Sequence, residues 1–315
     1  MNALITGAAG FIGSHLTEYL LDGGATVTGI DCFTDYYSRA IKEAHISSPR
    51  KRTGFRFVEA QIENIDLNSL LQRITHVFHL AAQPGVRRSW GRDFQIYTSC
   101  NIDTTQILLE ACVNVPLERF VYASSSSVYG DDVAFPMKET ARPQPISPYG
   151  VTKLAAEHLC KLYHINHKVP TVSLRYFTVY GPRQRPDMAF HRFIKAAITG
   201  NPITLYGSGT QTRDFTYITD TLSATAAAAT QGVPGRVYNI GGGSRVSISH
   251  VLAMIARCTN RKLDIRCEPT EKGDMRDTYA DTTLAETELN FKSTIELEEG
   301  IRAEHEWMLN SLSLI

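Results

Sequence analysis

The sequence predicts an α/β protein with a doubly wound parallel sheet and a smaller α/β C-terminal lobe. Three observations support this fold class. Short apolar runs alternate with amphipathic stretches over the first 180 residues, as expected for βαβ units that build a parallel sheet. A glycine-rich turn follows the first apolar run. After about residue 180, prolines divide the chain into shorter pieces, which indicates a change of architecture.

The expected elements follow from apolar runs and their flanking turns. Strands of the first part are expected at Ala3–Thr6, Val27–Ile30, Phe55–Val58, Val77–Leu80, Phe120–Ala123 and Val172–Leu174. A helix is expected over His15–Leu21, before Gly23 and Gly24. Later elements are strands Ile203–Tyr206 and Val237–Ile240 and helices Ala189–Thr199 and Ile248–Cys258. We expect a first domain over 1–180, with part of 211–243 returning to it, and a second over 181–315.

Composition excludes several classes of protein. Lys and Arg number 32, as do Asp and Glu, so the net charge is zero. A nucleic-acid or membrane-surface binder usually carries a basic excess, and no stretch reaches the apolar length of a membrane span. The six cysteines form no CxxC pair, so free thiols and no metal site are expected. We expect a soluble cytoplasmic protein without nucleic-acid or membrane partners.

The glycine-rich turn has the features of a dinucleotide site. Gly7, Gly10 and Gly13 lie between the first strand and the first helix, and Asp31 ends the second strand. Gly7 would permit the tight turn, Gly10 the approach of a pyrophosphate, and Gly13 the packing of the helix on the sheet. Asp31 would bind the ribose hydroxyls and repel a 2′-phosphate. The pattern predicts a Rossmann-type domain that binds NAD.

Tyr149 and Lys153 form a candidate catalytic pair. They follow Pro148 at the start of an expected helix, and a spacing of four places both side chains on one face. A phenol alone is too weakly acidic to act as a base at neutral pH, but a neighbouring ammonium and a nicotinamide cation favour its ionised form. We therefore expect Tyr149 to act as the catalytic base.

Longer strings of sequence resemble the extended short-chain dehydrogenase/reductases, in the NAD-dependent epimerase/dehydratase family. The resemblance is carried by residues 6–15, by His79-Leu80-Ala81-Ala82, by the Tyr149 and Lys153 pair, and by residues 175–182. It implies that Ser125, in the run Ser124–Ser127, is the catalytic serine that relays a proton to Tyr149. It also implies NAD contacts from Gly7, Gly10, Phe11, Ile12, Gly13, Asp31, Gln61, Ile62, Leu80, Ala81, Ala82, Tyr149, Lys153 and Tyr176. Gln61 departs from the family pattern, where an acidic residue is common, so a changed adenine contact is expected.

Within this family the chain most resembles the UDP-glucuronate 4-epimerases. The strings are Asp35-Tyr36-Tyr37, residues 79–87 and, above all, residues 177–189 with Arg185-Pro186-Asp187-Met188-Ala189. The resemblance implies inversion at C4 through a 4-keto sugar, with NAD bound tightly and not consumed. A sugar carboxylate needs hydroxyl donors and a guanidinium, and the UDP diphosphate needs further cations. The expected substrate residues are Ser126, Ser127, Thr178, Arg185, Arg192, Arg213 and Arg276.

Other activities remain open from the sequence. UDP-glucuronate decarboxylase is the second reading, and UDP-glucose or UDP-N-acetylglucosamine 4-epimerase is the third. A 4,6-dehydratase is disfavoured because Ser126 and Ser127 stand where such enzymes carry an acid pair. A non-catalytic NAD-sensing scaffold is disfavoured because Tyr149 and Lys153 are both present. The resemblance also implies a homodimer through helices near Cys100–Val113 and Tyr149–Asn166.

Overall fold

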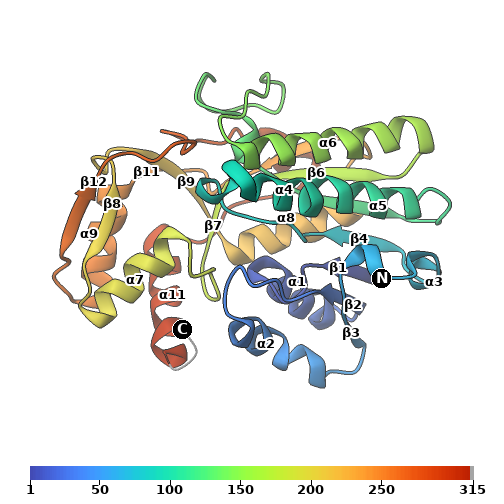
Figure 1. Cartoon of the computed structure of the whole chain (residues 1–315), viewed down its shortest axis with the longest axis horizontal. Coiled ribbons are helices and arrows are strands. Elements are labelled where there is room, and N and C mark those ends of the chain that lie inside the picture. The colour runs from blue at the N-terminus through green and yellow to red at the C-terminus, as the bar shows by residue number, and fades with distance from the viewer. Residues whose placement is uncertain (313–315) are drawn as a thin grey trace.

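A seven-stranded parallel sheet forms the centre of the molecule (Figure 1). The computed structural model describes residues 1–312. The strand order is β10-β6-β5-β4-β1-β2-β3. In chain order the strands are β1 Asn2–Thr6, β2 Thr26–Asp31, β3 Phe55–Glu59, β4 His76–His79, β5 Arg119–Ser125, β6 Thr171–Tyr176 and β10 Val237–Ile240. The predicted α/β class with a parallel sheet is confirmed, and each of these strands overlaps an expected one.

Helices cover both faces of this sheet, and its inner strands β1, β4, β5 and β6 are therefore mostly buried. One face is packed by α1 (Phe11–Asp22), α8 (Ile218–Thr230) and α10 (Thr283–Leu289). The other is packed by α3 (Leu67–Leu71), α5 (Thr104–Ala111) and α6 (Pro148–His167). The short helices α2 (Arg39–Ser47) and α4 (Phe94–Thr98) lie beside α1 and α6 respectively.

A smaller lobe occupies the left of Figure 1 and is built from two short sheets and three helices. One sheet joins β7 (Thr178–Tyr180), β9 (Thr212–Tyr217) and β11 (Arg245–Ser247); the other pairs β8 (Ile203–Tyr206) with β12 (Ile265–Glu268). The helices are α7 (Ala189–Thr199), α9 (Ile248–Thr259) and α11 (Leu297–Ser311). Their apolar faces meet in one core that includes Phe190, Ile194, Val251 and Ile301.

The chain passes between the two parts more than once. After β9 it returns to the large sheet as α8 and β10, where Tyr238 aligns with Leu174 of β6. The carboxylate of Asp220 on α8 then accepts hydrogen bonds from Thr294, through its backbone N–H at 3.0 Å and its hydroxyl at 2.8 Å. Glu304 of α11 accepts a hydrogen bond from Gly181 N at 2.9 Å. Buried carboxylates therefore fasten the C-terminal segment to both parts.

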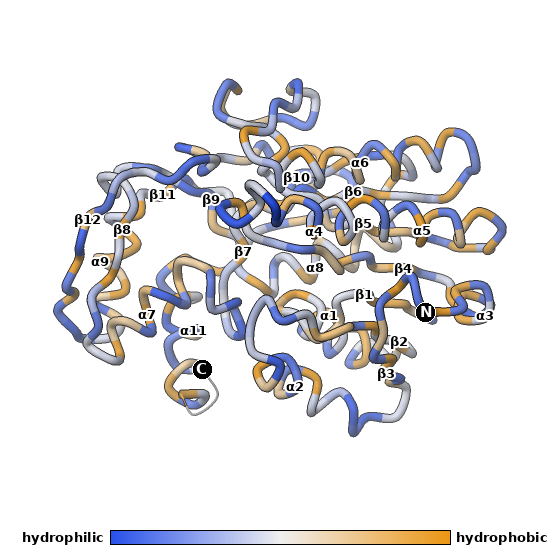
Figure 2. Tube along the Cα trace, in the orientation of Figure 1, coloured by the Kyte–Doolittle hydropathy of each residue, from blue (hydrophilic) through white to orange (hydrophobic). Residues whose placement is uncertain are grey.

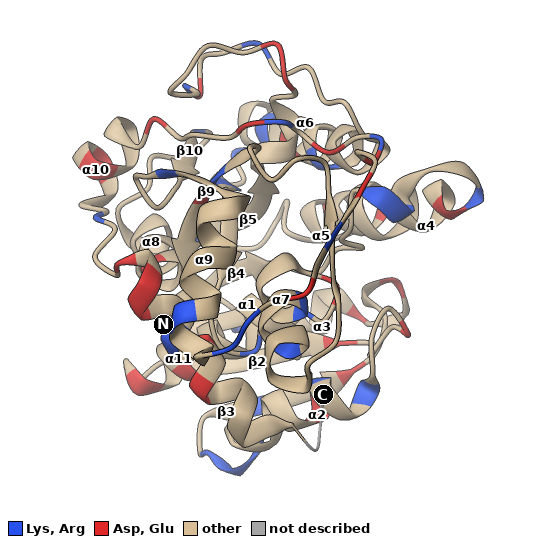
Figure 3. Cartoon of the chain, turned by 90° about the vertical axis from the view of Figure 1, so that its left-hand side faces the viewer, with Lys and Arg blue, Asp and Glu red and all other residues tan. Residues whose placement is uncertain are grey.

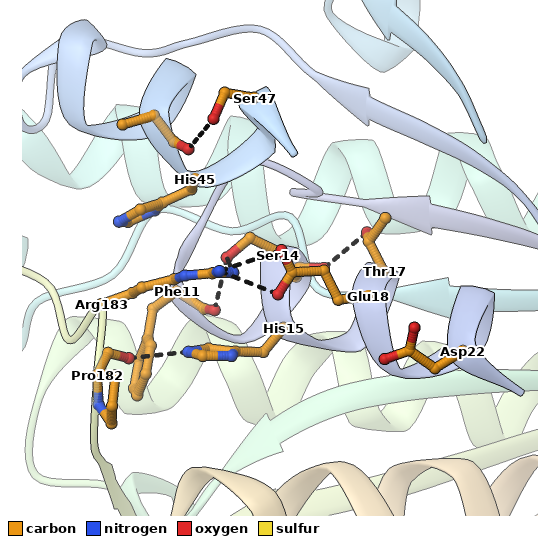
Figure 4. Close-up of polar contacts among 12 residues, drawn as sticks. Phe11, Ser14, His15, Thr17, Glu18, Asp22, His45, Ser47, Pro182 and Arg183 are labelled. Atoms are coloured by element: carbon orange, nitrogen blue, oxygen red, sulfur yellow. Dashed lines mark hydrogen bonds and ion pairs between the residues drawn. The ribbon is translucent and has the colours of Figure 1, made fainter. Parts of the chain in front are cut away.

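The segment that leaves β7 is fastened to α1, as Figure 4 shows. Arg183 has a left-handed backbone (φ 66°) and pairs with Glu18, with 2.9 Å between Nη2 and Oε2. Its Nη1 donates to Ser14 Oγ at 3.4 Å, and His15 Nε2 lies 2.9 Å from the carbonyl oxygen of Pro182. The start of the loop after β7 is thus held against the helix that follows the glycine-rich turn.

Both the Lys and Arg positions and the Asp and Glu positions are distributed along the chain in the view of Figure 3. Hydrophobic residues in Figure 2 concentrate in the strands and in the helix faces packed on them. Among residues 1–312, no helix is both long and apolar enough to cross a membrane.

A buried ion pair joins α6 to the sheet. Arg175 on β6 donates to Glu157 on α6 through Nη2 at 2.6 Å and Nε at 3.0 Å. The hydroxyl of Ser124 on β5 donates to the same carboxylate at 2.7 Å. Both charged side chains are almost fully buried, and the guanidinium also lies over the Tyr129 ring at 4.7 Å. The remaining donors and acceptors of the pair are therefore largely satisfied, which offsets part of the cost of burying two charges.

We predict that Glu157→Gln destabilises the fold, because it leaves the Arg175 charge buried without its counter-charge. Removing one partner of a buried pair costs about 3–5 kcal/mol. Equilibrium urea unfolding should show a loss of this size. The double variant Glu157→Leu with Arg175→Met should recover a large part of the loss, because no unpaired charge remains. An unchanged unfolding free energy in Glu157→Gln would contradict this account.

Candidate active site

Every site residue predicted from the sequence lies on the wall of one cavity of about 1130 Å³. The cavity follows the carboxyl ends of the strands, where ligands bind in open α/β sheets, and continues into the C-terminal lobe. The glycine turn and Asp31 come from the ends of β1 and β2. The serines, Tyr149 and Lys153 come from the end of β5 and from α6. The arginines come from the loop after β7, from α7, from β9 and from the segment before Asp277.

The turn after β1 accepts only glycine at two positions. Gly7 has φ 72°, and a Cβ there would lie 2.9 Å from the backbone N of Ala81. A Cβ on Gly13 would collide with the carbonyl oxygen of Gly7. Gly10 is the N-cap of α1, and no side chain caps this helix end. The first N–H groups of α1 therefore remain available to an anion, as in a pyrophosphate site.

Asp31 holds the glycine turn in place. Its Oδ2 accepts a hydrogen bond from Ala9 N at 3.0 Å, and its Oδ1 accepts one from Phe33 N at 2.9 Å. Each carboxylate oxygen has a second lone pair, so both retain capacity to accept a hydrogen bond from a hydroxyl group. Nearby, Gln61 precedes the 3₁₀ turn Ile62–Asn64, and its Oε1 accepts from Asn64 Nδ2 at 3.2 Å.

Tyr149 and Lys153 project from the first turns of α6. The Ser147 hydroxyl caps this helix by accepting from Gly150 N at 3.1 Å, and Pro148 occupies its first position. Burial raises the pKa of Tyr149, while Arg185 and a hydrogen bond from Ser125 act in the opposite direction. Burial lowers the pKa of Lys153 to about 7, opposed by Cys160 and Glu157.

Burial causes both pKa shifts, the upward one of Tyr149 and the downward one of Lys153. Burial disfavours either charge alone, so a lone phenolate or a lone ammonium is costly at this site. Lys153 Nζ also lies 4.6 Å from the centre of the Tyr122 ring, where a cation is attracted to the aromatic face. Transfer of a proton from the phenol to a neighbouring amine creates both charges together. A low-dielectric site tolerates such a pair of opposite charges better than either charge alone.

The arginines form two groups. Arg213 is held by its Nη1, which donates to the carbonyl oxygens of Thr212 and Arg276, both at 2.9 Å. Burial lowers the pKa of Arg213, while Asp274, Asp277 and Asp131 oppose this shift. The Arg276 side chain is 80% exposed at the cavity rim, whereas Arg192 on α7 is half-buried.

Arg185, in the loop after β7, belongs to a second group on the wall of the same cavity. Its Nε and Nη2 donate to the two carboxylate oxygens of Asp187, each at 3.0 Å. The hydroxyl of Tyr36 donates to Asp187 Oδ2 at 3.2 Å. Both Arg185 and Asp187 act on the pKa of Tyr149, in opposite directions, so the pair lies within electrostatic reach of that phenol.

The sequence prediction did not name as site residues several polar or aromatic residues of the cavity wall, among them Arg87, Tyr36, Asp187 and Tyr206. Arg87 Nη2 lies 2.6 Å from Asp274 Oδ2, and its guanidinium lies 4.1 Å over the Tyr206 ring. Its position just after β4 was a usable signal, because this edge of a parallel sheet carries the ligand site. The contact partners come from distant segments, so no local pattern identifies them.

Comparisons with known proteins point to one protein family. The model of the NAD dependent epimerase/dehydratase family matches residues 3–241. The solved UDP-glucuronic acid 4-epimerase of Bacillus cereus, in complex with UDP-glucuronic acid and NAD, has a TM-score of 0.96 at 46% identity, covering 98% of this chain and 99% of that one.

Two curated relatives also match along nearly their full length. An uncharacterized UDP-glucose epimerase of Bacillus subtilis (strain 168) is 44% identical over 308 residues, covering 96% of each chain. The UDP-glucuronate 4-epimerase of Thermodesulfobacterium geofontis (strain OPF15) is 35% identical over 316 residues, covering 99% of this chain and 97% of the relative. On these matches, the chain belongs to the NAD dependent epimerase/dehydratase family.

Proposed function

We propose that the chain is an NAD-dependent UDP-sugar 4-epimerase that converts UDP-glucuronate to UDP-galacturonate through a transient 4-keto sugar. The observation that carries this proposal is Arg185, a guanidinium on the same cavity wall as Tyr149 and close enough to lower the pKa of that phenol. A guanidinium at this position can form charge-assisted hydrogen bonds with the C6 carboxylate of a glucuronyl group. The names of the Bacillus cereus and Thermodesulfobacterium geofontis proteins support the same substrate.

The residues present fit NAD. The turn carries glycines at the positions where a Cβ would collide with neighbouring backbone atoms. The uncapped end of α1 offers free N–H groups to the pyrophosphate. Asp31 can accept hydrogen bonds from the ribose hydroxyls while it accepts one from Ala9 N. Its negative charge would repel the 2′-phosphate of NADP. When bound, NAD would supply the removal and return of a hydride at C4 of the sugar. The remaining chemistry is proton transfer and positioning by the chain.

We assign the proton transfer to Tyr149, with Ser125 as its partner. Tyr149 takes the proton of the C4 hydroxyl and later returns it, and Ser125 hydrogen-bonds the phenol. Lys153 lies one helical turn away and favours the phenolate when it is charged. Ser126, Ser127, Thr178 and Arg185 would bind the sugar, while Arg192, Arg213 and Arg276 would bind the UDP phosphates from the lobe formed mainly by 181–315.

A UDP-glucose 4-epimerase is the second candidate, because the Bacillus subtilis relative carries that name. UDP-glucose has a neutral hydroxymethyl group in place of the carboxylate, so it would leave the free Nη1 end of Arg185 without an anionic partner. Discrimination of this kind can be large, since a site built for a polar group pays when that group is missing. The cytoplasmic location expected from the sequence stays a prediction.

We predict that the purified protein converts UDP-glucuronate to UDP-galacturonate faster than it converts UDP-glucose, as followed by proton NMR. Tyr149→Phe should lower kcat by at least about 100-fold, because positioned general bases contribute 10²–10⁴-fold. Tyr19→Phe, at a 43% exposed position on α1, is the matched control and should keep full activity. Pentose products would indicate a decarboxylase, and turnover of UDP-glucose alone would identify the second candidate.

We predict that Lys153→Met stabilises the fold at low pH while it lowers activity. Burial holds the pKa of Lys153 near 7 in the folded chain, below its ordinary 10.5. Below about pH 7 the folded protein carries a buried charge at a cost, and this cost fades between pH 7 and 10.5 as folded and unfolded chains both lose the proton. The gain of Lys153→Met in unfolding free energy should be largest at pH 6 and shrink by pH 9. A gain independent of pH would refute the buried-charge explanation.

We further propose that the protein is a homodimer that pairs through α5 and α6. The outward side of α6 exposes Val151, Leu162 and Ile165, which are 46%, 52% and 53% exposed. Sedimentation should give twice the mass of one chain, because burying these side chains removes apolar surface from water. Leu162→Asp with Ile165→Asp should yield monomers, and Leu309→Asp on α11, 48% exposed, is the control. A monomeric wild-type protein would end this proposal.

A further inference from the structure

We propose that Asp187 is a positioning residue for the sugar carboxylate: it holds one edge of the Arg185 guanidinium so that the other edge faces the sugar. The inference rests on the proposed function and deepens it. A guanidinium has five N–H donors in a fixed plane, and Asp187 uses one on Nε and one on Nη2. Within residues 1–312 the Nη1 end of Arg185 has no protein acceptor among its hydrogen bonds. That end is available to a second carboxylate.

The backbone around Arg185 is fixed by contacts that do not involve Asp187. Arg183 is bound to Ser14 and Glu18 on α1 (Figure 4). The Gln184 side chain donates to Val179 O at 3.1 Å and accepts from His191 N at 2.9 Å. Because the two residues directly before Arg185 are both anchored, the main freedom that remains is rotation of the Arg185 side chain. The bidentate contact with Asp187 removes that freedom.

Asp187 is itself held by a residue from the cofactor-binding part of the chain. Tyr36, in the loop after β2, donates its hydroxyl to Asp187 Oδ2 at 3.2 Å. Gly85 makes room for this phenol, because a Cβ at Gly85 would collide with the Tyr36 hydroxyl. Arg185 keeps the pKa of Asp187 below its ordinary value, so the carboxylate stays ionised at neutral pH. Tyr36, Asp187 and Arg185 therefore form a chain of contacts from the cofactor half to the sugar site.

The position of Arg185 matters because the 4-keto intermediate is a β-keto acid. If its C5–C6 bond stands perpendicular to the plane of the C4 ketone, that bond breaks, CO₂ leaves, and the electron pair forms an enolate at C4 and C5. That enolate then takes a proton and becomes a 4-keto pentose. A fixed guanidinium that holds the carboxylate also keeps the C5–C6 bond away from this perpendicular orientation, whereas a mobile one does not. Asp187 thus protects the product through Arg185 without touching the sugar.

The two side chains also have opposite effects on the base. The negative charge of Asp187 raises the pKa of Tyr149, and the positive charge of Arg185 lowers it. The other titratable groups that face this phenol are Lys153 on α6, Tyr97 on α4 and Tyr122 on β5. Removal of Asp187 should move the acid limb of kcat to lower pH, and removal of Arg185 should move it to higher pH.

The test is Asp187→Ala, with Asp187→Glu as the rescue variant. We expect Asp187→Ala to raise the pentose share of product from UDP-glucuronate by about tenfold, as loss of a charge-assisted contact implies. Its acid limb should move down by about one pH unit, the lower end of a neighbouring charge's effect. Asp187→Glu should restore part of both, and Arg185→Gln should shift the limb upward. Asp22→Ala, which removes an aspartate paired with Arg52 on the outer surface, is the matched control.

Two outcomes would overturn the proposal, and both differ from failure of the proposed function. If wild-type protein epimerises UDP-glucuronate but Asp187→Ala shows wild-type product shares and an unmoved acid limb, Asp187 does not position Arg185. A lower kcat with neither change would assign Asp187 a purely structural role and would also overturn it. If the wild-type protein leaves UDP-glucuronate unchanged, the proposed function fails before the variants are compared.

Discussion

The contact between Glu157 and Arg175 sets the position of the proposed catalytic helix. Two opposite charges, almost fully removed from water, join α6 to β6, and the Ser124 hydroxyl ties the same carboxylate to β5. Lys153 and Tyr149 lie one and two turns before Glu157 on the same helix face. Any shift of this ion pair would therefore displace both groups from the serines at the end of β5. Glu157 also opposes the loss of the Lys153 proton. The same carboxylate therefore positions the helix and stabilises the charge of Lys153.

Around this helix the cavity combines rigid and adjustable parts. The cofactor side is made mostly of backbone, in a glycine turn that has no space for side chains. The Asp31 carboxylate fixes this backbone by accepting hydrogen bonds from two N–H groups. The sugar side includes long side chains, and two of them, Arg185 and Arg213, are paired with an acidic group or with carbonyl oxygens. Such pairing keeps guanidinium groups in place before a ligand arrives, which lowers the entropy that binding must overcome.

Features with a local period were predictable, and features made by distant segments were not. The glycine turn, the pair Tyr149 and Lys153, and the strands each depend on spacings within about ten residues, so the sequence alone indicates them. The contact of Tyr36 with Asp187 joins residues 151 positions apart, and no periodicity encodes it. The small sheet of β7, β9 and β11 was missed for the same reason: its strands of three to six residues are short and paired out of chain order.

The return of the chain to the large sheet has a consequence for synthesis on the ribosome. The edge of β6, at Thr171–Tyr176, pairs with β10, which is made only after about 60 further residues. At about 5–20 residues per second, this edge stays open for roughly 3–12 seconds. An unpaired apolar strand is a template for aggregation. A fragment that ends near residue 180 would keep that open edge permanently, so the cofactor half should be insoluble when expressed without the later residues.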